Sequence, residues 1–322
     1  MSDTPVIFFA FNRPDTTYRV LAALKQQTLR PPKIIAFVDG ARSPLDEARI
    51  AQVKRLIQAV DWTGVELHER EKNFGTAANI IGGISEVFEQ GYSQAIIIED
   101  DVLPAPATYE SFCHLLAHYK NDQQVFSVGG FPHLLKNALP NYPYEVIMSL
   151  RFGSWGWGTW AERWQSIVAD LRDFQNPYSN PADIPPGAGA DLAGYLPRIQ
   201  ARPGFYWDIP LVLLSLQRQW VHAHTAYYLI QNIGFREGVS FTTYEPELEH
   251  FMHQNVHIQN RLPQVLAPVE VQQDVLDAVE AYIYTYQNST YPAKNSGWRA
   301  YYKLLRWRYR LIMSLRKLAQ KT

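Results

Sequence analysis

Three consecutive acidic residues, Glu99, Asp100 and Asp101, directly follow the apolar run at residues 95–98. Three adjacent carboxylates repel one another on a bare surface, and a divalent cation would remove that cost. A hard cation held by carboxylates also suits a diphosphate, because it acts as a Lewis acid on the charge of a leaving phosphate group. A solvated acidic turn is one alternative interpretation, and a two-metal phosphate hydrolase that also uses Asp39 is another.

The first 130 residues alternate short apolar or β-branched runs with longer helical patterns, which predicts βα units on a mostly parallel sheet. We expect strands at residues 6–11, 33–38, 65–68, 95–98 and 125–128, and helices at residues 15–27, 45–60, 76–89 and 107–119. Ligands of such sheets lie at the carboxyl ends of the strands. Those ends carry Asn12 with Arg13, Asp39 with Gly40, and the acidic triplet.

A series of motifs runs through most of the chain. In order, they are NRPDT, FVDG, NFGTAAN, IIIEDDV, GSWGWGTWAERW, YWD and IQNIGF. Together they resemble a group of bacterial family-2-like glycosyltransferases and are distantly similar to the eukaryotic N-acetylglucosaminyltransferase I. The resemblance covers residues 5–243. It implies a GT-A fold, a nucleotide-sugar donor, Mn²⁺ or Mg²⁺, and an inverting mechanism.

The resemblance implies donor-site roles for residues near the strand ends. Arg13 and Asp39 would frame the nucleotide base and ribose. The chemistry agrees, because a carboxylate accepts the N–H of uracil and a guanidinium stacks on the ring or reaches the phosphates. Asn79 matches a donor-site position of the relatives. In the alternative interpretation Arg13 is a surface arginine, Asp39 marks a turn with Gly40, and Asn79 is a local helix cap.

Within the acidic triplet, the family pattern makes Asp101 the direct metal ligand and Asp100 a contact to the ribose or sugar of the donor. We group Glu99 with the same donor site and expect it to have a structural role there. Trp157 lies in a segment of tryptophans and glycines that, by resemblance, forms the wall between donor and acceptor. The alternative is a Trp-rich core turn that precedes a helix at residues 159–168.

The motif YWD places the catalytic acid of the family pattern at Asp208. We interpret Asp208 as the general base that takes the proton of the acceptor hydroxyl. It follows Tyr206 and Trp207, whose rings would partly desolvate the carboxylate and raise its pKa toward the working range. The alternative is that Asp208 only caps a helix that runs to about Arg218.

Two histidines of a predicted strand are candidates for a second metal site. His222 and His224 alternate on a predicted strand and face one side, but a third ligand is not evident, so we expect structural roles for both. The relatives often carry a histidine shortly after the IGF motif. This chain has residues 238–243, GVSFTT, there instead, which weakens the case for a mobile lid over the diphosphate.

The composition is that of a globular protein, with 322 residues, 47% apolar and 19% charged, enough to bury a core. No apolar run approaches the roughly 18 to 20 residues of a membrane span, and the first residues lack signal-peptide features, so we expect a cytoplasmic protein. There is neither a Walker A motif nor a strand-linked G-x-G-x-x-G, which argues against kinases and dehydrogenases. We expect no nucleic-acid partner.

We expect a GT-A α/β domain at residues 1–268, with a nucleotide-sugar-binding half at 1–130 and an acceptor half at 131–268. A helical extension follows at residues 269–322. Its residues 298–322 carry eight Lys or Arg and no acid, with large apolar residues at helical spacing. That composition is typical of an interfacial amphipathic helix, so peripheral attachment to the inner face of the cell membrane is one interpretation. Docking onto the acidic body of the protein or a partner subunit is the other.

These observations predict a metal-dependent hexosyl- or N-acetylhexosaminyltransferase. It would move a sugar from a nucleotide diphosphate sugar to a hydroxyl of a glycan or glycolipid in polysaccharide biosynthesis. The donor that we expect is a UDP-sugar. The rival from another class is a non-catalytic carbohydrate-binding or scaffolding protein on a decayed transferase fold. The intact acidic triplet together with Asp208 argues against it. A nucleotidyltransferase or phosphohydrolase would instead release pyrophosphate or phosphate.

Overall fold

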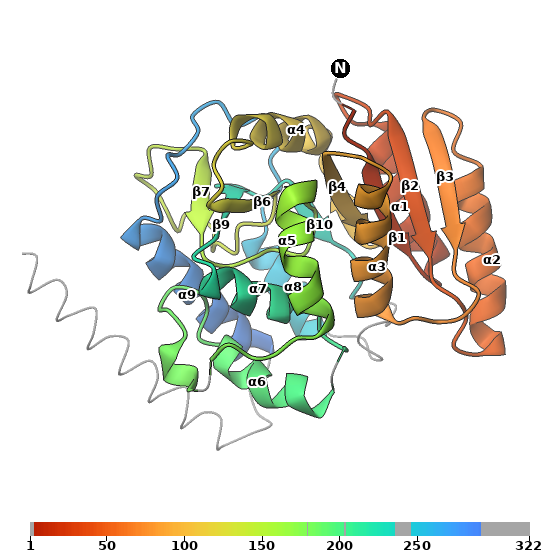
Figure 1. Ribbon diagram of the computed structural model, residues 1–322. Coiled ribbons are helices and arrows are strands. Elements are labelled where there is room, and N and C mark those ends of the chain that lie inside the picture. Colours follow the sequence, from red (N-terminus) through yellow and green to blue (C-terminus); the bar gives the residue numbers. More distant parts are fainter. Residues whose placement is uncertain (1–2, 179, 203, 236–245, 291–322) are drawn as a thin grey trace, which may run out of the picture.

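A computed structural model describes residues 3–178, 180–202, 204–235 and 246–290 (Figure 1). Within these residues one sheet has the strand order β3-β2-β1-β4-β8-β6-β9-β7. Its parallel part comprises β1 (Val6–Ala10), β2 (Lys33–Val38), β3 (Gly64–Glu69) and β4 (Gln94–Glu99), and β6 (Val125–Gly129) is parallel to β9 (Val221–Thr225). The strands β7 (Val146–Ser149) and β8 (Trp157–Trp160) run antiparallel to their neighbours. The predicted α/β class with a mostly parallel sheet flanked by helices is confirmed.

Both faces of the sheet are covered by helices, so β1 is buried along its whole length. Val6 and Phe8 point into one apolar cluster, while Ile7 and Phe9 point into another, as the alternation of side chains along a strand requires. The first cluster includes α1 (Pro14–Lys25), α2 (Pro44–Gln58) and α4 (Thr108–His118). The second includes α3 (Thr76–Glu89), α5 (Ala161–Arg172), α6 (Leu192–Ala201) and α7 (Asp208–Gln217).

A second, two-stranded sheet forms beside the end of β4. There β10 (Ile230–Asn232) pairs antiparallel with β5 (Val102–Pro104), which directly follows the acidic triplet. Helices α8 (Pro246–Asn255) and α9 (Gln273–Thr290) pack on each other, and α9 also packs on β7. In Figure 1, α9 in blue lies at the opposite side of the molecule from β3 and α2 in orange.

The elements expected in the first 130 residues are all present, with ends that differ by a few residues. Helix α3 begins at Thr76, as predicted, and α2 begins at Pro44, one residue before its predicted start. The predicted helix at 159–168 begins two residues later, because Trp160 is still part of β8. The helix expected at 271–285 is α9, whereas the one expected at 298–318 lies outside the described residues. No helix in the described ranges is long and apolar enough to cross a membrane.

Candidate functional site

Charged side chains from three segments meet at one edge of the sheet. Arg13 follows β1, the acidic triplet Glu99, Asp100 and Asp101 ends β4, and Asp208 begins α7. Strands β1 and β4 are parallel neighbours, so their carboxyl ends lie side by side. Glu99 interacts electrostatically with the other four side chains of this group. The structure therefore brings together five of the eight predicted site residues.

Arg13 is the cation of this group, and only 9% of its surface is exposed. Its guanidinium donates to Oδ1 of Asp100 and, at 2.6 Å, to Oδ2 of Asp101. The other oxygen of Asp100 accepts the backbone N–H of Phe11 at 3.2 Å. Burial opposes the charge on Arg13, but the two carboxylates outweigh it and raise the pKa of Arg13. The residue is thus a buried partner of the acids and not a surface arginine.

The carboxylates of this edge outnumber the cations. Burial raises the pKa of Asp100, against the opposing charge of Arg13. The pKa of Glu99 is raised well above its usual range, first by burial and then by Asp101, with a further contribution from Asp208. The three carboxylates of the acidic triplet therefore share the guanidinium of Arg13, an arrangement that a divalent cation would relieve.

The chemistry of this donor set fits a divalent cation only if the substrate supplies further ligands. Within the described residues, no group of three or more His, Cys, Asp or Glu side chains is close enough to hold a metal ion. Mg²⁺ is commonly held by one or two carboxylates together with substrate phosphates and water. Asp101 has 15% of its side chain exposed, against 2% for Asp100. Asp101 is therefore the better placed of this pair to bind such a cation.

The segment after β10 closes against this edge. The backbone N–H of Ile233 donates to the carbonyl of Asp101 at 2.8 Å. A Cβ at Gly234 would overlap Oδ2 of Asp101 and crowd a guanidinium nitrogen of Arg13. Only glycine lets the backbone approach the Arg13–Asp101 pair this closely.

Asp208 is brought to the same edge by a stack of tryptophans. Trp207, which precedes it, stacks on Trp157 of β8 with ring centroids 6.0 Å apart, and β8 is the neighbour of β4. Oδ1 of Asp208 accepts the backbone N–H of Ile209 at 2.9 Å, in the first turn of α7. Burial raises the pKa of Asp208. A carboxylate with raised proton affinity has the property that a general base requires.

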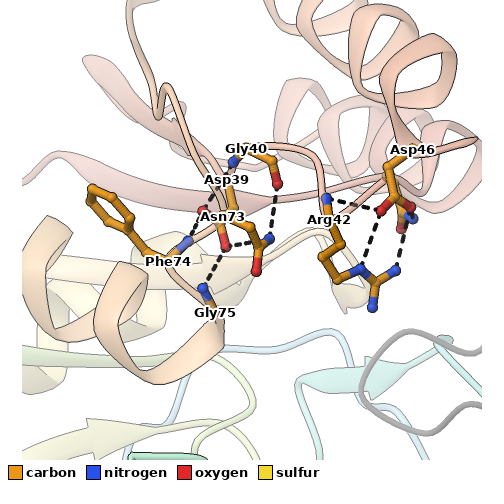
Figure 2. Close-up of polar contacts among 8 residues, drawn as sticks. Asp39, Gly40, Arg42, Asp46, Asn73, Phe74 and Gly75 are labelled. Atoms are coloured by element: carbon orange, nitrogen blue, oxygen red, sulfur yellow. Dashed lines mark hydrogen bonds and ion pairs between the residues drawn. The ribbon is translucent and has the colours of Figure 1, made fainter. Parts of the chain in front are cut away.

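Asp39 lies on the next strand end, where it holds the loop between β3 and α3 (Figure 2). Its Oδ1 accepts the backbone N–H groups of Gly40 at 3.0 Å and Phe74 at 2.8 Å. Its Oδ2 accepts the side-chain amide of Asn73 and the backbone N–H of Gly75, each at 3.0 Å. Four donors fill the accepting capacity of a carboxylate. Asp39 thus positions a loop beside the site, and its direct contact to a base stays a prediction.

Asn79 has a similar local partner. Its Oδ1 accepts Nε of Arg70 at 3.1 Å, while the guanidinium of Arg70 also pairs with Glu86 at 2.7 Å. The same guanidinium lies 4.9 Å from the ring of Phe37 and 5.4 Å from that of Phe74. Asn79 is 4% exposed. It therefore fixes Arg70 at the base of α3 and does not cap the helix with its own side chain.

Trp157 is fully buried and belongs to the core on the α3, α5 and α7 side of the sheet. Its ring contacts Phe152 edge-on at 4.9 Å as well as stacking on Trp207. The structure gives it a packing role that places Asp208. A direct contact between its ring and a donor stays a prediction.

The two histidines of β9 face the same side, as predicted, with ring centroids 6.4 Å apart. His222 is hydrogen-bonded to Ser127 at 2.8 Å, and His224 to the carbonyl of Arg151 at 3.1 Å. Burial lowers the pKa of both, for His224 to about 4. They are neutral core side chains, in agreement with the structural interpretation.

Two groups near the site were not predicted from the sequence. Gly234 lies in the motif IQNIGF, and its type alone was a signal, because a glycine after a short strand often marks a close backbone approach. Arg151 forms a buried ion pair with Asp191 at 2.8 Å and interacts electrostatically with Asp208. No sequence spacing links these three residues, which come from different segments.

Comparison with known proteins gives structural matches only. No family model matches the chain, and no curated protein matches it significantly. The structure is similar to that of the mannosyltransferase PcManGT from Pyrobaculum calidifontis in complex with GDP-Man and Mn²⁺. That match covers 97% of this chain and 83% of the other, at 12% identity and a TM-score of 0.45.

Two further structures are similar to this chain over smaller parts of it. Mouse xyloside xylosyltransferase 1 matches 68% of this chain and 84% of its own length, at 8% identity and a TM-score of 0.38. TarS 1–349 of S. aureus in complex with UDP-GlcNAc matches 40% of this chain and 34% of its own length, at 12% identity and a TM-score of 0.30. All three names describe glycosyltransferases or, for TarS, a complex with a nucleotide sugar.

Proposed function

We propose that the protein is a GT-A glycosyltransferase that moves a sugar, with inversion, from a UDP-sugar to a hydroxyl of a glycan or glycolipid. The observation that carries the proposal is the grouping of Arg13, Glu99, Asp100, Asp101 and Asp208 at the carboxyl edge of the sheet. Binding of a nucleotide at this edge agrees with the general position of ligands in open α/β sheets.

The roles divide between the two halves of the site. Asp101 would hold a Mn²⁺ or Mg²⁺ ion, which supplies charge neutralisation for the leaving diphosphate. Arg13 orients the two acids and limits their repulsion, so that Asp101 keeps its place at the strand end. Asp208 accepts the proton of the acceptor hydroxyl as the oxygen attacks the anomeric carbon from the face opposite the diphosphate.

Aromatic rings beside Asp208 support a sugar acceptor. Tyr206 contacts Phe205 at 4.9 Å and Tyr195 at 5.6 Å between ring centroids. Phe205 is 48% exposed, and the guanidinium of Arg202 lies 5.5 Å from its ring. The exposed ring of Phe205, with half-buried tyrosines beside it, offers an apolar face with polar neighbours, which suits the mixed surface of a pyranose ring. We assign this surface to the acceptor.

The first experiment identifies the nucleotide. Thermal shift with UDP, GDP, dTDP and CMP, each with and without Mn²⁺, should show a metal-dependent stabilisation by UDP. A ligand at one hundred times its dissociation constant contributes about 2.7 kcal/mol. Sugar transfer is then followed by release of free UDP. Release of pyrophosphate or phosphate would favour a nucleotidyltransferase or phosphohydrolase, and absence of any nucleotide effect would favour the decayed, non-catalytic fold.

The Asp208→Asn variant tests the base. An amide still accepts the N–H of Ile209 but cannot take a proton, so turnover should fall by about 10²-fold or more. The melting temperature and the UDP affinity should match those of the wild type. Near-normal transfer by this variant would remove Asp208 from the mechanism.

A further inference from the structure

A buried ion pair lies next to the segment that carries Asp208. Arg151, which follows β7, donates to both carboxylate oxygens of Asp191 at 2.9 and 2.8 Å. The two side chains are 9% and 8% exposed. Burying two charges is costly, and such pairs are weak evidence of stabilisation. The pair therefore calls for a role other than holding the fold together.

The pair reaches Asp208 through neighbouring rings and through its charges. Phe152, which follows Arg151, contacts Trp207 with ring centroids 5.8 Å apart, and Trp207 precedes Asp208. After burial, which raises the pKa of Asp208, the cation of Arg151 lowers it and the anion of Asp191 raises it. Glu99 of β4 also interacts electrostatically with Asp208.

Helix α9 holds the loop that carries the anion of this pair. Glu280 accepts the backbone N–H groups of Gly187 at 3.0 Å, Gly189 at 3.1 Å and Ala190 at 3.2 Å. Both glycines have positive φ, at 89° and 109°, a conformation that favours glycine. A Cβ at Gly189 would also overlap the facing atoms of the ion pair. The loop thus covers the ion pair, and the carboxylate of Glu280 in α9 holds the loop in place by hydrogen bonds.

We propose that Arg151 and Asp191 are positioning residues that orient Asp208 and set the charge around its carboxylate, and that Glu280 of α9 holds this pair in place. The inference rests on the proposed function, in which Asp208 is the base. It makes α9 a part of the acceptor side of the site and not an appended extension.

The test uses two variants with opposite expected effects. Arg151→Met removes the cation, so the pKa of Asp208 should rise, whereas Asp191→Asn removes the anion, so the pKa of Asp208 should fall. The acidic limb of the pH profile of kcat/KM for the acceptor should move in the same two directions. UDP affinity should stay unchanged in both variants. Arg151→Lys keeps the charge and should leave the limb near its wild-type position.

A readout without substrate separates this inference from the proposed function. The ¹³C-NMR titration of aspartate carboxyl carbons reports Asp208 directly, with the signal assigned by its absence in Asp208→Asn. Opposite shifts in Arg151→Met and Asp191→Asn support the inference even if no sugar transfer is found. Equal shifts, or none, overturn it even if transfer is found. Should Arg151→Met fail to fold, the downward shift in Asp191→Asn decides alone.

Glu280→Gln tests the part assigned to α9. One accepting oxygen is lost, so the N–H of Ala190 or those of the two glycines lose their partner, and the loop should exchange its amide hydrogens faster. Acceptor turnover should fall about 10-fold through misplacement of the pair, with UDP affinity unchanged. Glu270→Gln, at an exposed position before α9, is the matched control. Wild-type turnover in Glu280→Gln would overturn the role of α9.

Discussion

Asp100 and Asp101 share the guanidinium of Arg13 but differ in what else they do. Asp100 is nearly buried and also accepts the backbone N–H of Phe11, so it fixes the turn after β1. Asp101 keeps part of its carboxylate accessible. The two adjacent acids therefore differ in role, because Asp100 holds the backbone and Asp101 stays accessible.

Substitution of each acid by asparagine should separate these roles. Asp101→Asn should abolish turnover and the Mn²⁺-dependent part of UDP stabilisation, with little change in the melting temperature of the free protein. Asp100→Asn should lower the stability of the free protein by about 1–3 kcal/mol, because it disturbs a buried charged hydrogen bond. Thermal shift with and without Mn²⁺ and UDP measures both. Retained Mn²⁺ dependence in Asp101→Asn would show that the metal ligand lies elsewhere.

Asp39 should act through the loop that it holds. Asparagine has one accepting oxygen and so leaves donors of the loop unsatisfied. Asp39→Asn should therefore cost about 1–3 kcal/mol in the free energy of unfolding and weaken UDP binding as well. Asp61→Asn, with an 83% exposed side chain, is the control. If Asp39→Asn weakens UDP binding but leaves urea unfolding unchanged, the carboxylate contacts the nucleotide and the loop does not depend on it.

The short pairing of β5 with β10 shapes the candidate site, although each strand has only three residues. It carries the backbone of Gly234 against the Arg13–Asp101 pair. Sequence reasoning found the strands of the parallel sheet, because they are continuous apolar runs between helical patterns. It did not find β5 or β10, since three-residue strands have no measurable periodicity.

Gly234→Ala tests this approach of β10 to the site. The added Cβ overlaps a carboxylate oxygen, so either Asp101 or the backbone after β10 must shift. We expect turnover to fall by about 10²-fold, the loss that a 1 Å misplacement of a site group produces. Gly82→Ala in α3 has no atom closer than 3.8 Å to the new Cβ and should keep full activity. Equal activity of the two variants would contradict the placement of β10.

The candidate site shows the same limits of sequence reasoning. Arg13, the acidic triplet and Asp208 were predictable, because they follow strands or sit in recognisable motifs. The filled hydrogen bonds of Asp39 and the full burial of Trp157 were not, since they depend on which loop and which helix face each side chain. The sequence predicts which residue lies at a strand end. Whether its carboxylate oxygens remain available for a ligand depends on the tertiary structure.

For the molecule as a whole, buried histidines connect stability to pH. Burial lowers the pKa of His133, His222 and His224 below the usual 6.5. The unfolded chain therefore binds more protons than the folded one below pH 6.5. The contribution of these histidines to the free energy of unfolding is fully present above that pH and is lost as the pH falls. For His224 the loss continues down to about pH 4. Each histidine contributes a slope of about 1.4 kcal/mol per pH unit in its window.

Urea unfolding between pH 7.5 and 4.5 measures this slope. His133→Asn should make it shallower by about one proton, and asparagine tolerates the positive φ of 54° at this position. His250→Asn changes an exposed histidine and should leave the slope unchanged. Parallel slopes in wild type and His133→Asn would mean that His133 titrates alike in both states.

The contact between Glu280 and the loop at Gly187 also has a consequence for the order of events during synthesis. The two residues are 93 positions apart, so the ribosome adds Glu280 roughly 5 to 20 seconds after Gly187. During that interval α7, β9 and β10 are still being added, while the loop that wraps Arg151 and Asp191 lacks the carboxylate that holds it. The described strands and the acidic triplet are therefore all translated before the loop at Gly187 gains this partner.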